Sequence, residues 1–206
     1  MGRRRLYLVL CLSSHCFAKE VVGTAGPEID VSLTVHFYNY SKVSNQTLRA
    51  AQVQASSIFR TAGIMMTWVE CPISEADTER VSCPQSKRHF HVDLQIVPAS
   101  MAASRHQLDG ELGLATYPGA YVFYDRLREF CRTHSARETM VLSHVIAHEI
   151  GHLLLGAGSH SNAGIMLPVF NPDDLTKERR SYFTESETKR MRDEIRKGLV
   201  RLQTFK

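Results

Sequence analysis

The 206-residue chain is built from short segments in which apolar residues either alternate with polar ones or recur at helical spacing. Alternation and short apolar runs predict β-strands, whereas a period of three to four residues predicts amphipathic helices. The expected strands span residues 29–38, 64–70, 90–97 and 120–124, and a further extended segment spans 110–117. The expected helices span residues 45–62, about 136–155 and about 186–202.

One of these expected helices carries the run His148-Glu149-Ile150-Gly151-His152. Residues four apart on a helix lie on the same face, so the two imidazoles can bind one Zn²⁺ at about 2.0–2.1 Å. The carboxylate of Glu149 can hold and deprotonate a water molecule at the metal. Because most other positions of this helix are apolar, we expect it to be buried, where two histidines and a glutamate need partners. The run therefore predicts a catalytic zinc site rather than an exposed pair of histidines.

A third ligand is expected shortly after the helix. Gly156 is typical of a helix end and Gly158 of a flexible joint, so the chain can turn back and bring His160 to the metal. Three protein ligands and one water molecule are the pattern of catalytic zinc sites. The alternative third ligands are the carboxylates of Glu178, Glu185 and Glu187, in a charged region that we expect to be solvated surface.

Other histidines have no ligand spacing. His144 lies one turn before His148, but the helical drift turns it away from His152. We therefore expect His144 to be a surface histidine or one that supports a ligand. The remaining candidates without a predicted role are His89, His91, His106 and His134.

The stretch HEIGHLLLGAGSH, followed by Ser161-Asn162-Ala163-Gly164-Ile165-Met166, resembles the metzincin metalloproteases. Their pattern is HExxHxxGxxH followed by a Met-turn. The present chain is longer between the second and third histidines, so His160 comes two residues later than in the family pattern. This extended spacing is similar to that of a group of small secreted bacterial proteins. The resemblance covers residues 138–167 and implies that Met166 forms an apolar floor under the ligands.

The resemblance also implies the fold and the substrate-binding edge. The expected fold is an α+β, zincin-like single domain, with a twisted mixed sheet, two long helices packed on it and a small C-terminal helical part. Gly113, Leu114 and Ala115 would belong to the edge strand that lines the cleft, where a substrate backbone adds as an extra strand. A plain surface loop is the alternative for this segment. Pro168 stands where the family often has a tyrosine, so the sequence indicates no tyrosine at that position.

The first residues are typical of a secretory signal peptide. Arg3, Arg4 and Arg5 precede an apolar run at 6–12, and small and polar residues follow to Ala18. We expect residues 1–18 to be removed, residues 19–206 to form the catalytic domain, and the protein to be secreted or periplasmic. The apolar run is too short to span a bilayer. Removal of the three arginines would lower the net charge from +4 to +1, so nothing indicates a nucleic-acid partner.

Three cysteines follow the expected cleavage site. Cys71 and Cys83 flank a polar stretch that we expect to be a loop, and in an oxidising compartment they would form a disulfide. Cys131 would then be a buried thiol. The alternative is that the cysteines bind zinc, but their spacing matches no zinc-ribbon pattern.

The sequence thus predicts a secreted zinc-dependent endopeptidase, a monomer with one catalytic Zn²⁺ and Glu149 as the general base. Its substrate would be a peptide or a protein. Two alternatives remain: a secreted zinc-stabilised binding module without peptidase activity, and a zinc hydrolase of a non-peptide amide. Glu149 argues against the first alternative, because a structural zinc needs no base.

Overall fold

The computed structural model describes residues 29–73, 83, 90–102, 110–116, 119–169 and 182–204. The predicted signal peptide at 1–18 and Glu178 lie outside these residues. Within the described part of the chain, no helix is both long and apolar enough to cross a membrane.

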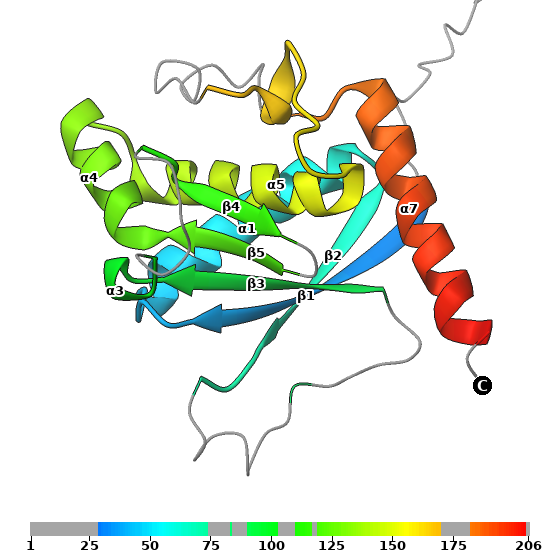
Figure 1. Cartoon of the computed structure of the whole chain (residues 1–206), viewed down its shortest axis with the longest axis horizontal. Helices are drawn as coiled ribbons and strands as arrows, with labels where there is room; N and C mark the ends of the chain where they lie inside the picture. Colours follow the sequence, from blue (N-terminus) through cyan, green and yellow to red (C-terminus); the bar gives the residue numbers. More distant parts are fainter. Residues whose placement is uncertain are drawn as a thin grey trace, which may run out of the picture.

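Five strands form a single mixed sheet (Figure 1). The strands are β1 (Val31–Asn39), β2 (Ile64–Glu70), β3 (His91–Val97), β4 (Gly113–Thr116) and β5 (Gly119–Phe123). Their order across the sheet is β2-β1-β3-β5-β4. All neighbouring pairs are parallel except β4 with β5, so β4 is an antiparallel strand at one edge.

Two long helices, α1 (Asn45–Thr61) and α5 (Glu138–Leu155), pack against each other and against the sheet (Figure 1). Helix α1 begins at a cap in which the Ser44 hydroxyl accepts a hydrogen bond from the Thr47 amide at 3.1 Å. The side chains between helices and sheet are fully buried; they include Leu33, Val35, Phe59, Ile146 and Ile150. Burial of this apolar surface is the main term that stabilises the arrangement. The predicted α+β fold, with a mixed sheet and two long helices, is confirmed.

In the C-terminal part, the described residues include a 3₁₀ turn, η2 (Gly164–Met166), and helix α7 (Glu185–Thr204). A capping box begins α7: the Glu187 amide donates to the Thr184 hydroxyl at 3.3 Å, and the Thr184 amide donates to the Glu187 carboxylate at 2.7 Å. The expectation that Glu187 is solvated was wrong, because the capping box holds this side chain at 6 % exposure.

Several boundaries also differ from those predicted. The extended segment expected at 110–117 forms a strand only over β4, and the helix that carries His148 and His152 begins at Glu138 rather than near 136. Two helices were not predicted: α3 (Ala99–Ala102) and α4 (Tyr124–His134). Helix α4 follows β5 directly, without a side-chain hydrogen bond at its N-cap, and only two of its residues are buried, Leu127 and Cys131. Neither a start signal nor a wide apolar face marks this helix in the sequence.

The cysteines lie as predicted. Cys71 and Cys83 form a disulfide with their Cα atoms 5.2 Å apart. Cys131 is a free thiol on α4 and is 8 % exposed. Burial, with a smaller contribution from the charge of Glu138, raises the pKa of this thiol to about 11, so it stays protonated and unreactive at neutral pH.

Candidate metal centre

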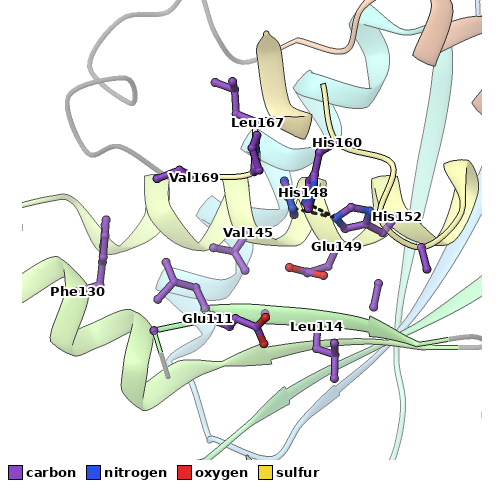
Figure 2. Close-up of a pocket in the computed structure, with 17 residues that line it drawn as sticks. Glu111, Leu114, Phe130, Val145, His148, Glu149, His152, His160, Leu167 and Val169 are labelled. Carbon is purple, nitrogen blue, oxygen red and sulfur yellow. Dashed lines mark hydrogen bonds between the residues drawn. The ribbon is translucent and has the colours of Figure 1, made fainter. Parts of the chain in front are cut away.

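Three imidazoles converge at one point beside α5 (Figure 2). The Nε2 atom of His152 lies 3.0 Å from Nε2 of His148 and 3.2 Å from Nε2 of His160. Two nitrogens bound to one tetrahedral zinc at the usual bond length are separated by about 3.3 Å. The separations and the donor atoms therefore fit a single zinc ion held by three histidines.

The segment after α5 accounts for the convergence of His160. The helix ends at Gly156, where φ is 101°, and a second positive φ of 71° follows at Gly158. Residues with a side chain rarely adopt such values, so the two glycines allow the sharp reversal. The Gly156 amide still donates to the His152 carbonyl oxygen at 2.9 Å, and the His160 amide donates to the Gly158 carbonyl oxygen at 2.8 Å. The extended spacing between the histidines thus brings the third imidazole to the other two.

The ring of His148 is held by the backbone of η2. Its Nδ1 lies 2.9 Å from the carbonyl oxygen of Ile165. Because a carbonyl oxygen only accepts hydrogen bonds, Nδ1 carries the proton and the lone pair of Nε2 points to the metal position. No sequence pattern indicates this partner, because it is a main-chain atom.

The histidines on α5 also have the protonation state that metal binding requires. Burial, followed by the neighbouring imidazoles of His148 and His160, lowers the pKa of His152 to about 4. Burial is likewise the main cause that lowers the pKa of His148. Both rings are therefore neutral at pH 7, and a zinc ion needs to displace no proton from their Nε2 atoms.

Met166 packs against α5 at Gly151, the residue before His152. A methyl group added at Gly151 would lie 2.5 Å from the Met166 sulfur, and Met166 is fully buried. The 3₁₀ turn that contains Met166 is held by the residues just before α7, because the Ile165 amide donates to the Tyr182 carbonyl oxygen at 2.9 Å. The structure thus places an apolar side chain against the helix that carries His148 and His152.

Glu149 lies on the face of α5 that meets the edge strand. It is 7 % exposed, and a Cβ at Gly113 of β4 would lie 2.6 Å from its side chain. Burial raises the pKa of Glu149 to about 8, with a further increase from the negative charge of Glu111. A carboxylate with a pKa near neutrality can both accept and return a proton.

A cleft of about 660 Å³ opens between β4 and α5. Gly113, Leu114 and Ala115 line it on one side, and the three histidines and Glu149 line it on the other (Figure 2). Because β4 is an edge strand, one side of its backbone is unpaired with other described strands and can hydrogen-bond an extended chain. The segment therefore is a strand at the cleft, not a surface loop. Pro168 also lines the cleft.

The other candidates lie apart from this group. Within the described residues, no carboxylate joins the three histidines within ligand distance of one another, so neither Glu185 nor Glu187 does. His144 is half-buried rather than on the surface, and its Nδ1 lies 2.9 Å from the carbonyl oxygen of Met140 in its own helix. His134 is exposed and makes a similar contact with Phe130. His89 and His106 lie outside the described residues.

A second histidine cluster on the sheet was not predicted. His36 of β1 is 5 % exposed, and its Nδ1 lies 3.5 Å from the Asp93 carboxylate. Its ring stacks on His91 with centroids 4.7 Å apart. The sulfurs of Cys71 and Cys83 also lie within 4.8 Å of His36, but they are joined as a disulfide and so are not thiolate ligands. Only the alternation of β1 and β3 could have indicated that these side chains share one face.

No protein-family model matches the chain, and no curated protein matches it. Among solved structures, the chain is similar to archaemetzincin from Methanopyrus kandleri, with 12 % sequence identity and a TM-score of 0.47. The match covers 80 % of the present chain and 96 % of the archaemetzincin chain.

Proposed function

We propose that the protein is a secreted zinc-dependent endopeptidase. The observation that carries the proposal is the geometry of the cleft, where three Nε2 atoms at zinc-ligand separations lie beside a buried glutamate. An edge strand runs along the opposite wall of the same cleft. A metal site, a base and a surface for an extended backbone are the three parts that peptide hydrolysis at zinc needs.

His148, His152 and His160 would hold the metal, which supplies a Lewis acid that polarises the scissile carbonyl and increases the acidity of water. The backbone of β4 would bind the substrate chain in an extended conformation next to Glu149. The Glu149 carboxylate would accept the proton of the attacking water and then donate it to the leaving amine. Contact with Gly113 limits the positions that this carboxylate can take, and so directs it toward the cleft.

Two other functions use the same residues. A zinc-stabilised binding module needs the histidines, but it does not need a buried glutamate. Burial of an ionised carboxylate costs free energy that such a module would have no reason to bear. The raised pKa of Glu149 therefore favours a hydrolase. A hydrolase of a non-peptide amide would use the same metal and base, but it has no need of a strand edge along the cleft.

Secretion is proposed from the N-terminal pattern, and the disulfide supports it. Disulfides persist in oxidising compartments and are rare in the cytosol, and Cys71 and Cys83 are bonded. N-terminal sequencing of protein recovered from the culture medium or the periplasm tests this proposal. We expect a chain that begins at Lys19; a chain that is exported but still begins at Met1 contradicts it.

The catalytic proposal is tested with a mixture of peptides of diverse sequence and a mass-spectrometric readout of the products. The zinc-loaded protein should cleave internal peptide bonds, a chelator should abolish cleavage, and added Zn²⁺ should restore it. Glu149→Gln keeps the three ligands, so it should bind about one zinc and cleave about 10²–10⁴-fold more slowly. Zinc binding without cleavage of any peptide by the unmodified protein would favour the binding module.

A further inference from the structure

A second carboxylate, Glu111, lines the cleft a short distance along the chain before β4. We propose that Glu111 selects substrates that carry a lysine or an arginine side chain next to the scissile bond. This inference rests on the proposed peptidase function and specifies its substrate class.

The backbone on either side fixes where Glu111 points. The Phe123 amide donates to the Leu112 carbonyl oxygen at 2.9 Å, so the pairing with β5 continues one residue before β4. The Arg126 guanidinium donates to the Glu111 carbonyl oxygen at 3.2 Å. Glu111 lines the same cleft as Gly113 and Glu149, and Figure 2 shows the side chains of Glu111 and Glu149 there.

The charges in the cleft favour a cationic substrate group. Among the described residues that line it, the acidic side chains are Glu111 and Glu149, and there is no lysine or arginine. The structure shows no ion pair between Glu111 and any other described residue. An ammonium or guanidinium group at Glu111 would form a charge-assisted hydrogen bond in a half-buried position.

Apolar side chains on the other walls of the cleft fit the rest of such a side chain. Phe130 and Val145 line the cleft on the side of α4 and α5, and Leu167 and Val169 line it after η2 (Figure 2). Lysine and arginine have apolar stems with a charged end, and they bury the stem against apolar surface while the charge meets a polar partner. An apolar wall with one carboxylate thus selects these two residues over both aliphatic and acidic ones.

The test uses one peptide that the protein cleaves, with the residues on the two sides of the scissile bond varied in turn. Each position carries lysine, norleucine or glutamate; norleucine has a similar stem without the charge. We expect kcat/KM to be about 10-fold higher for lysine than for norleucine at one of the two positions. In Glu111→Gln this ratio should fall to about one, and in Glu111→Lys the glutamate peptide should become the preferred one. Because the result is a ratio within each variant, a general change of rate does not affect it.

Glu70→Gln is the matched control. Glu70 is exposed at the end of β2, at the other edge of the sheet, and the substitution removes the same charge. The lysine-to-norleucine ratio should be unchanged in this variant. In the slow Glu149→Gln background, calorimetry should show tighter binding of the lysine peptide, and adding Glu111→Gln should remove the difference.

The outcomes separate the two proposals. If the unmodified protein cleaves no peptide, the proposed function fails. If it cleaves the lysine and norleucine peptides equally well, the function stands and the selectivity is overturned. All peptides are compared with and without N-terminal acetylation. A preference that disappears on acetylation would assign Glu111 to the substrate's α-amine and overturn the assignment to a side chain.

Discussion

Gly113 and Glu149 are in such close contact that a methyl group on Gly113 would lie 2.6 Å from both Cγ and Oε1 of the glutamate. One residue belongs to the edge strand and the other to the helix that carries two of the candidate metal ligands. The absence of a side chain at Gly113 thus sets the position of the proposed base relative to the strand that would bind the substrate.

We predict that Gly113→Ala lowers peptidase activity by about 100-fold, because a displacement of about 1 Å in a reacting group has an effect of this size. Zinc content should be unchanged, since Gly113 contacts the base and not the ligands. Gly119→Ala on the neighbouring strand is the control, because its methyl group would make only ordinary contacts, the nearest at 3.5 Å. Rates and zinc content measured on the same preparations decide the matter; equal activity of the two variants contradicts the prediction.

A second prediction separates the third ligand from the base. His160→Ala leaves two histidines on α5, so zinc affinity and turnover should both fall. Glu149→Gln should lower turnover alone, because the ligand set is intact. Elemental analysis and peptide cleavage provide the two readouts. Full zinc occupancy with a near-normal rate in His160→Ala would mean that the loop after α5 carries no ligand, and Glu178 would then be the candidate to test.

Glu149 should also make the stability of the metal-free protein depend on pH. Its pKa is raised to about 8 from an ordinary value of 4.5, so the folded state binds its proton more tightly than the unfolded state does. The associated stability is complete below pH 4.5 and is lost as the pH rises through 8, a loss of at most about 5 kcal/mol. Glu149→Gln removes this dependence. In the presence of a chelator, the melting temperature of the variant should exceed that of the unmodified protein clearly at pH 9 and little at pH 5. A difference in melting temperature that is the same at both pH values would contradict the prediction.

The contact between Gly151 and Met166 predicts a stability effect. A methyl group on Gly151 would lie 2.5 Å from the Met166 sulfur and 3.2 Å from Phe183, so Gly151→Ala should destabilise the fold by about 1–3 kcal/mol. Met166→Ala removes a fully buried side chain and should cost more by itself. The double variant should nevertheless lose less than the sum of the two, because the smaller side chain makes room for the methyl group. Denaturant unfolding of the four proteins measures this coupling, and simple additivity would refute it.

Most of the fold could be predicted because the apolar pattern reports burial directly. Strand β2 begins and ends where the pattern indicates, and the alternation of Leu33, Val35 and Phe37 identifies the buried face of β1. Helix α4 could not be predicted, since its stability comes from packing against α5 and not from a cap or a wide apolar stripe. Tertiary contacts of this kind override local sequence preference.

The candidate site could be predicted as far as its side chains repeat at a fixed spacing. His148, Glu149 and His152 lie on one helix, so their relative positions follow from helical geometry. Main-chain partners leave no such trace: the carbonyl oxygen of Ile165 would be available whichever residue stood there. Glu111 faces the cleft because the pairing with β5 continues to Leu112, and only the three-dimensional structure reveals this pairing.

The peptide unit of Ile165 joins His148, a candidate metal ligand, to a distant part of the chain. Its carbonyl oxygen contacts His148, and its amide donates to the carbonyl oxygen of Tyr182. A chain shortened to end before Tyr182 would keep all three histidines and still lose the support of one of them. Such a truncation would also remove α7, whose Met191 and Ile195 are fully buried, so it would destabilise the core as well as the support of His148. Tyr182, which precedes α7, therefore supports His148 through the peptide unit of Ile165, although it contributes no candidate ligand atom.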